Sequence, residues 1–158
     1  TSSRRDDRDA TAFVAAGPCE YEVAGVYVRG VPAPADAGRK TTLYAIDIDR
    51  ISVGHIPELT DTPGDALLDD MGAIHLLLIG IRSEPEYLLP NEIIRIVNRI
   101  EPNIVIPYGP DSGEAAEAAW RMVARDLSGA VPAADEHLTA NRRQLPEPID
   151  VRLLERKN

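Results

Sequence analysis

Two short apolar segments with an amphipathic helix between them constrain this fold most. Residues 74–79 are apolar at almost every position, which is typical of a strand covered on both faces. Residues 92–99 place their isoleucines and valine on one face at helical spacing, with Asn91 as the expected N-cap. Residues 103–106 form a second apolar segment that ends at Pro107. A strand, a helix and a strand in this order predict a parallel strand pair joined by a right-handed crossover.

Two antiparallel hairpins are expected before this unit. Polar and apolar residues alternate over 21–28, with a tight bend or bulge at Gly25. Alternation returns over 42–48 and 51–56, and the Asp-Arg pair between them is expected to form a two-residue turn. The first half of the chain is therefore predicted to be mostly β-structure.

The remaining elements are predicted from turn signals and helical spacing. Residues 31–40 contain two prolines and a glycine, and we interpret them as a loop. A short helix is expected over 62–71 and a longer one over 112–127, which ends at Gly129. A last strand is expected over 149–154. Sheets with covering helices predict α/β or α+β layers, and with no interdomain linker the whole of 1–158 is expected to be one domain.

Composition excludes several classes of partner. The 158 residues carry a net charge of −9, which disfavours binding to nucleic acid or to anionic membrane surfaces. No apolar run reaches the roughly 18–20 residues that a membrane-spanning helix needs. The single cysteine, Cys19, excludes an internal disulfide, so the cytoplasm is the expected location. Aromatic residues make up only 4%, so the core is expected to be aliphatic.

Five segments match the motifs of one family in order and at similar spacing. Residues 17–23 match a Pro-Gly-Glu-Tyr-Glu-Val motif, and 42–49 match an Asn-Thr-Ile-Tyr strand. Residues 53–59 match His-Leu-Gly-Asp-Leu, 101–109 match Glu-Pro-x-Ile-Val-Ile-Pro-Met-His, and 137–147 match Leu-Thr…Leu-Pro-Glu. The chain thus resembles the metallo-β-lactamase superfamily, in its branch of small Zn-dependent hydrolase-like proteins.

The resemblance implies a fold and a position within it. The family fold is an αββα sandwich, in which two sheets pack face to face and helices lie outside. The chain resembles the C-terminal two-thirds or more of the family domain, so the N-terminal strands are expected to be missing. A sheet that lacks these strands would expose an edge, which could pair with a second copy or with another chain.

The resemblance also marks the positions of the family's metal ligands. These former metal-site positions are Ser3, Arg5, Asp7, Arg8, Ala35, Glu58 and Gly109. None is a histidine, and an arginine guanidinium is permanently cationic and cannot bind a metal. The two carboxylates alone would make a weak site for a hard cation at best. We therefore expect no zinc or other cofactor, and a non-catalytic binding or structural homologue in place of a metal-dependent hydrolase.

A rearranged metal site is the alternative. His55, Glu58 and His75 lie on neighbouring predicted strands, and imidazole with carboxylate suits zinc or iron. Such a site would support an active hydrolase of esters, lactones or phosphodiesters. The plainer interpretation makes both histidines packed, hydrogen-bonded strand residues, with His137 on the surface and Cys19 a small buried residue. The arginines at positions 4, 5 and 8 either form a solvated loop or fill the former metal cleft.

Overall fold

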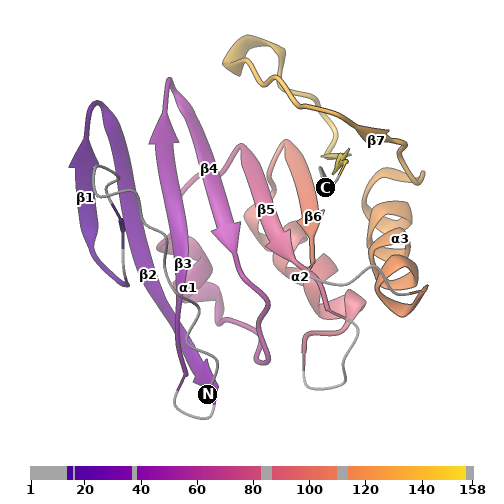
Figure 1. Ribbon diagram of the computed structural model, residues 1–158, viewed down its shortest axis with the longest axis horizontal. Helices are drawn as coiled ribbons and strands as arrows, with labels where there is room; N and C mark the ends of the chain where they lie inside the picture. The colour runs from indigo at the N-terminus through magenta and orange to yellow at the C-terminus, as the bar shows by residue number, and fades with distance from the viewer. Residues whose placement is uncertain (1–13, 16, 37–38, 83–86, 110–113, 156–158) are drawn as a thin grey trace.

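A seven-stranded mixed sheet dominates the computed structural model of this chain (Figure 1). The structure describes residues 14–15, 17–36, 39–82, 87–109 and 114–155. The strand order is β1-β2-β3-β4-β5-β6-β8, with β7 and β9 paired separately. The strands are β1 (Glu20–Val23), β2 (Val26–Asp36), β3 (Arg39–Ile48), β4 (Ile51–Ile56), β5 (Leu76–Gly80), β6 (Ile104–Tyr108), β7 (Ala134–Asp135), β8 (Asp150–Val151) and β9 (Leu153–Leu154). The helices are α1 (Asp65–Asp69), α2 (Pro90–Ile100), α3 (Glu114–Ser128) and the 3-10 turn η1 (Arg142–Gln144).

The sheet changes from antiparallel to parallel at β4. Strands β1 to β4 pair antiparallel, whereas β4, β5, β6 and β8 pair parallel. The parallel β5–β6 pair with α2 between its strands confirms the strand–helix–strand prediction. Two parallel strands need a connection that crosses over the sheet and packs on it. Helix α2 is this connection, and its isoleucine-rich face packs on the sheet. Ile93, Ile96 and Val97 on that face are buried.

Both predicted hairpins form, and each turn has two residues in the left-handed region. Ala24 and Gly25 have φ values of 51° and 80°, and Asp49 and Arg50 have 48° and 66°. Two positive φ values in succession are the geometry of a type I′ turn, whose twist suits the flanking strands. The tight register of the strands on either side holds Asp49 and Arg50 in this conformation without a glycine.

The loop predicted for residues 31–40 is wrong. Strand β2 continues through Pro32 and Pro34 to Asp36, and β3 already begins at Arg39. Strand β1 pairs with β2 only as far as Arg29, so the rest of β2 has β3 as its single neighbour among the described strands. A proline there removes no bond to a second neighbour, which is the setting in which sheets accept proline. The pairing register of β2 with β3 shifts between Ala33 and Asp36, so the strand is irregular around Pro34.

Several predicted boundaries also differ. Helix α2 begins at Pro90 with Leu89 as its N-cap, whereas the sequence predicted a start at Glu92 with Asn91 as N-cap. The Glu92 carboxylate accepts the Leu89 N–H at 2.8 Å and so closes the earlier start. Helix α1 is only five residues long, shorter than predicted. The last predicted strand divides into β8 and β9, with Arg152 between them. Gly129 ends α3 as predicted, with φ of 74°.

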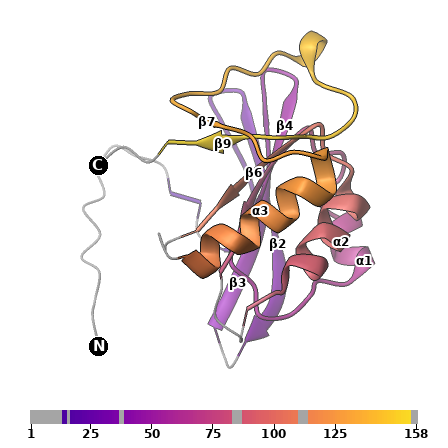
Figure 2. The same cartoon turned by 90° about the vertical axis from the view of Figure 1, so that its right-hand side faces the viewer.

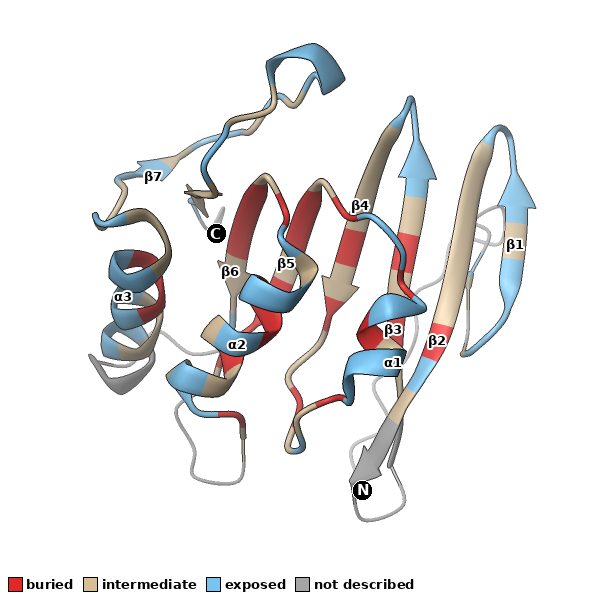
Figure 3. Ribbon diagram, turned by 180° about the vertical axis from the view of Figure 1, so that it is seen from behind, coloured by how far each residue is buried: buried red, intermediate tan, exposed pale blue. Residues whose placement is uncertain are grey.

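The helices gather on one face of the sheet (Figure 3). Their buried side chains meet the alternate strand residues that point the same way, and together these form the main aliphatic core. Fully buried members include Leu43, Ile56, Leu77, Val105 and Val123. In the edge-on view the helices lie on one side of the sheet, while the segment that follows α3 passes over its top (Figure 2). This helix–sheet arrangement is the α/β architecture that the sequence predicts.

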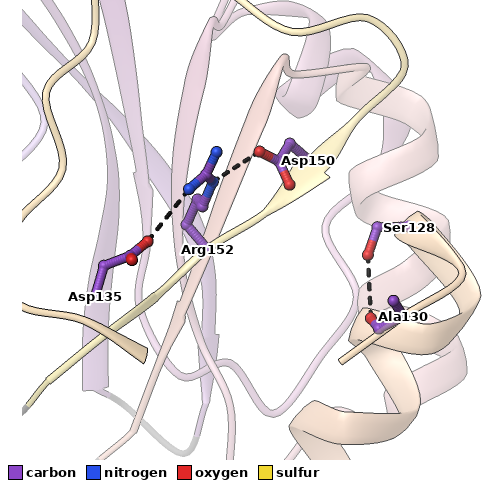
Figure 4. Close-up of polar contacts among 5 residues, drawn as sticks. All are labelled: Ser128, Ala130, Asp135, Asp150 and Arg152. Atoms are coloured by element: carbon purple, nitrogen blue, oxygen red, sulfur yellow. Dashed lines mark hydrogen bonds and ion pairs between the residues drawn. The ribbon is translucent and has the colours of Figure 1, made fainter. Parts of the chain in front are cut away.

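The segment after α3 covers one end of the opposite face. Leu138, Ala140 and Leu145 pack there against a small buried cluster of Leu76, Ile104 and Ile106. Arg152 ties this segment to the sheet, because its Nε donates to Asp150 at 2.7 Å and its other guanidinium nitrogen donates to Asp135 at 3.2 Å (Figure 4). Among the described helices, none is long and apolar enough to cross a membrane.

Candidate functional site

The carboxyl ends of β4, β5 and β6 meet at one edge of the sheet and bring polar side chains together. His55 is near the end of β4 and lies opposite Tyr44 of β3 and Leu78 of β5. Tyr108 is the last residue of β6 and lies opposite Gly80. Parallel strands place their carboxyl ends side by side, and this edge is where open α/β sheets bind ligands. We call His55, Glu58 and Tyr108 the strand-end cluster.

A hydrogen bond joins the two rings of the strand-end cluster. The Tyr108 hydroxyl lies 2.8 Å from Nε2 of His55, and the rings stack with centroids 5.5 Å apart and planes 14° apart. A second, longer contact runs from the same hydroxyl to the Ile56 carbonyl at 3.4 Å. The tautomer of the imidazole decides which of the two groups donates in the shorter contact, and Nε2 is hydrogen-bonded in both cases.

Burial keeps both members of this pair neutral. It lowers the pKa of His55, against the nearby Glu58 carboxylate, which raises it. It also raises the pKa of the Tyr108 hydroxyl well above its usual value, and Glu58 adds to that increase. Desolvation penalises imidazolium and phenolate alike. At neutral pH both groups are therefore uncharged, and the hydrogen bond between them engages Nε2.

Glu58 reaches the cluster because residue 80 is glycine. The chain leaves β4 and passes over the end of β5, so that a Cβ at position 80 would stand 2.6 Å from the Glu58 backbone nitrogen. Glycine alone allows two backbones to come this close. The same crossing brings the Glu58 carboxylate near enough to influence the pKa of His55 and of Tyr108.

Gly109 lies beside the cluster and has no room for a side chain. A Cβ at this position would be 2.3 Å from the Ile81 carbonyl oxygen. The neighbouring residues explain this approach, because the Ile81 N–H donates to the Tyr108 carbonyl at 2.7 Å and draws the two strands' ends together. No side chain larger than a hydrogen atom fits position 109 unless the backbone moves.

His75 is not part of this cluster. The Nδ1 of His75 accepts the Ser52 backbone N–H at 2.9 Å, and the backbone N–H of His75 donates to the Ser52 carbonyl at 2.8 Å. Ser52 is near the start of β4, whereas Glu58 follows its end, so His75 lies at the opposite edge of the parallel strands. Burial, with a smaller contribution from Arg142, lowers the pKa of His75. The structure therefore separates His75 from His55 and Glu58, the other two residues of the alternative metal site.

The other residues singled out in the sequence have varied placements. Ser3, Arg5, Asp7 and Arg8, with the rest of the N-terminal arginine cluster, lie outside the described residues. Ala35 is in the bulged part of β2, and His137 is exposed. The prediction that Cys19 is buried is wrong. Its side chain is exposed. Its backbone carbonyl contacts β2, where it accepts the Gly30 N–H at 2.8 Å.

Sequence reasoning missed Tyr44 and Tyr108 as site residues. The Tyr44 ring lies 6.4 Å from that of His55, and its hydroxyl accepts the Gly17 N–H at 3.1 Å. Tyr44 thereby fastens the segment before β1 to the edge of the cluster. Aromatic residues make up only 4% of the chain. The occurrence of Tyr44 and Tyr108 in strands was therefore the one signal in the sequence that could have marked them as site residues.

Comparison with protein families identifies the fold. A family model described as the beta-lactamase superfamily domain matches residues 3–109, more than half of the chain. The chain belongs to the metallo-β-lactamase superfamily. This superfamily member has no significant match among curated proteins.

Solved structures support the same fold for this superfamily member. A Thermotoga maritima protein assigned to the Zn-dependent hydrolases of the metallo-beta-lactamase superfamily aligns with a TM-score of 0.65 at 16% identity, over 90% of this chain and 71% of that one. A mutant of CmlA beta-hydroxylase aligns with a TM-score of 0.62 at 15% identity, over 88% of this chain and 31% of that one. A Parabacteroides distasonis protein assigned as a metal-dependent hydrolase aligns with a TM-score of 0.54 at 14% identity, over 88% and 56%. The chain thus spans 71%, 31% and 56% of these proteins, and at such identities the likeness concerns the fold alone.

Proposed function

We propose that this chain is a metallo-β-lactamase-fold protein that binds no catalytic metal and acts as a binding or structural homologue of the hydrolases. The observation that carries this proposal is the packing of Gly109 against Ile81. By resemblance, Gly109 stands where the family places its last histidine ligand. The 2.3 Å distance from a Cβ to the Ile81 carbonyl oxygen leaves no space for an imidazole.

The engaged imidazole of His55 supports the same conclusion. A metal needs a free nitrogen lone pair, and Nε2 of His55 is already hydrogen-bonded to the Tyr108 hydroxyl at 2.8 Å. Glu58 offers a carboxylate beside it, but no third ligand lies near among the described residues. In the ranges that the structure describes, no three His, Cys, Asp or Glu side chains lie close enough to hold a metal ion. The described residues therefore do not fit the zinc that the fold family implies, and no catalytic step through it is derived.

The alternative of an active hydrolase with a rearranged site has no support from the geometry. It needs His75 beside His55 and Glu58, and His75 is bonded to Ser52 at the other edge of the parallel strands. Strand residues advance about 3.3 Å each, so the three steps from Ser52 to His55 span about 10 Å. One metal ion cannot bind ligands at both ends of that distance.

Metal content and metal-dependent stability test the proposal. We expect the purified chain to contain far less than one equivalent of zinc, manganese or iron by elemental analysis. We also expect added metal to leave the melting temperature unchanged, because a ligand raises it only by binding the native state. His55→Gln and His137→Gln form a matched pair, in the strand-end cluster and on the surface. Stoichiometric metal, or a metal-induced rise in melting temperature that His55→Gln abolishes and His137→Gln retains, would contradict the proposal.

The cytoplasm is the proposed compartment. Cys19 is the single cysteine of the chain and its thiol is exposed, a state that a reducing compartment preserves. Fractionation of the native host with an antibody against the protein tests this, and recovery outside the cytoplasm would contradict it.

A further inference from the structure

The Glu58 carboxylate has no partner among the residues that the structure describes. Within those residues no hydrogen bond or ion pair involves it, although the side chain is only partly exposed. Removing a carboxylate from water costs free energy, which hydrogen bonds or an opposite charge normally recover. A partly buried carboxylate without either of them indicates a place for a bound cation.

The backbone holds this carboxylate over the end of β5. A Cβ at position 80 would stand 2.6 Å from the Glu58 backbone nitrogen and 2.9 Å from its Cγ, so the Glu58 side chain begins directly above Gly80. Gly80 is paired with Tyr108 of β6, and His55 lies near the end of β4 on the other side of β5. In Figure 1 the arrowheads of β4 and β5 point to this same end of the sheet. Glu58 therefore lies between the two strand ends that carry His55 and Tyr108.

The groups beside the carboxylate offer a hydrogen-bond acceptor and apolar surface, but no positive charge. Both rings of the strand-end cluster are uncharged at neutral pH, and Glu58 is the charged group among the described residues that shifts their pKa values. The Tyr108 oxygen has a second lone pair, so it can accept a hydrogen bond besides its contact with His55. The stacked rings of His55 and Tyr108, with the Tyr44 ring 6.4 Å from that of His55, add an aromatic border.

We propose that the strand-end cluster binds the primary ammonium group of an aliphatic amine, with Glu58 as its counter-ion. An ammonium group has three N–H donors and no acceptor, which matches a carboxylate and a phenol oxygen. The aliphatic stem of the amine would lie along the aromatic rings, as the stem of a lysine does on apolar surface. The net charge of −9 attracts cations to the chain, whereas an anionic ligand would be repelled by Glu58.

This inference rests on the proposed function, because a metal ion bound to Glu58 would compete for the same carboxylate. The ammonium group could belong to a free amine or to a lysine side chain of a protein. Butylammonium represents the first source and Nα-acetyl-lysine amide the second. The tighter binder of the two identifies the source, and both carry the group that the inference names.

Titration of the wild-type chain with butylammonium chloride at constant ionic strength tests the site. Nuclear magnetic resonance signals of the His55 ring should shift and saturate in the millimolar range, which is the affinity that so small a ligand can reach. Tetramethylammonium carries the same charge without N–H donors and should bind at least about tenfold more weakly. Butanol has the stem without the charge and should leave the signals unchanged.

Glu58→Gln and Glu136→Gln form a matched pair of variants. Each removes one negative charge and keeps the length of the side chain, but Glu136 is exposed and lies outside the strand-end cluster. Glu58→Gln should weaken butylammonium binding at least about tenfold, and Glu136→Gln should leave it unchanged. Circular dichroism checks that both variants fold, and the comparison of ligands on the wild-type chain does not depend on either of them.

Three results would overturn the inference. They are no saturable shift of the His55 signals with butylammonium, equal binding of tetramethylammonium, and undiminished binding to folded Glu58→Gln. All titrations contain excess EDTA, so a failure here leaves the proposed function standing. The proposed function depends instead on the metal content that is measured before EDTA is added.

Discussion

A hydrogen bond of 2.8 Å joins the hydroxyl of Tyr108 to Nε2 of His55, and the two rings lie nearly parallel. This contact crosses from β6 to β4 over the end of β5, so it links the carboxyl ends of the parallel strands. It also engages the imidazole nitrogen that a metal would need. The same two residues therefore hold the ends of β4 and β6 together.

Tyr108→Phe tests the strength of this contact. Loss of the hydroxyl removes the hydrogen-bond partner of Nε2 in half-buried His55, so we expect the free energy of unfolding to fall by about 1 kcal/mol. Urea denaturation at pH 7.5 measures the change. In a His55→Gln background the same substitution should cost less, because the two residues are coupled. An equal loss in both backgrounds would show that the hydroxyl acts elsewhere.

Stability should fall as the solution is acidified below the ordinary pKa of histidine, about 6.5. Burial lowers the pKa of His55 and of His75 in the folded state. The unfolded chain then binds more protons than the native one between about pH 6.5 and the lower folded pKa values, so stability rises with pH in that window and is complete above it. Urea midpoints measured from pH 5.5 to 8 should show this slope. His55→Gln and His75→Gln should each reduce it, and an unchanged slope in both variants would refute the assignment.

Gly109→Ala should destabilise the protein by about 1–3 kcal/mol, the usual cost of forcing an extra methyl group into a packed site. The methyl carbon would lie 2.3 Å from the Ile81 carbonyl oxygen, so the ends of β5 and β6 must separate. Gly64→Ala is the control, because Gly64 has a negative φ and its Cβ would meet nothing within 4 Å. Thermal unfolding of the two variants should differ clearly. Similar melting temperatures would mean that the backbone at position 109 adjusts easily.

Glu92→Ala should cost about 1–2 kcal/mol, as the loss of a helix cap does. The Glu92 carboxylate accepts the Leu89 N–H at 2.8 Å and the Thr62 hydroxyl at 3.0 Å, so it closes α2 and fastens it to the segment before α1. Asn91, which the sequence predicted as the cap, is exposed on the first turn, and Asn91→Ala should change stability by less than about 0.5 kcal/mol. Chemical denaturation of both variants checks the order, and a larger effect at Asn91 would restore the original prediction.

Hydrophobic periodicity predicted the helices and strands that have a clear apolar face to bury. Strands β5 and β6 are apolar throughout, and α2 has an isoleucine-rich face. A parallel strand pair covered by the helix removes all of these side chains from water, so this arrangement is the stable one. The two hairpins were likewise predicted from alternation.

Prediction failed where neighbours in space override local preference. Pro32 and Pro34 indicated a loop, but β2 has only one strand beside it at that point and accepts them. Asn91 is a residue type that commonly caps helices. Pro90 and the Glu92 side chain nevertheless place the N-cap of α2 at Leu89, two residues earlier. Cys19 is small and apolar enough for a core, yet the turn before β1 leaves its thiol in solvent.

The sequence by itself determined most of the order of strands and helices, the aliphatic core and the superfamily. These follow from residue type and spacing along the chain. Only the tertiary structure decided which polar groups meet. The parallel register brought Tyr108 to His55 and left His75 at the other edge, and the crossing at Gly80 brought in Glu58. Contacts between residues far apart in sequence depend on strand register and backbone approach, which no local pattern encodes.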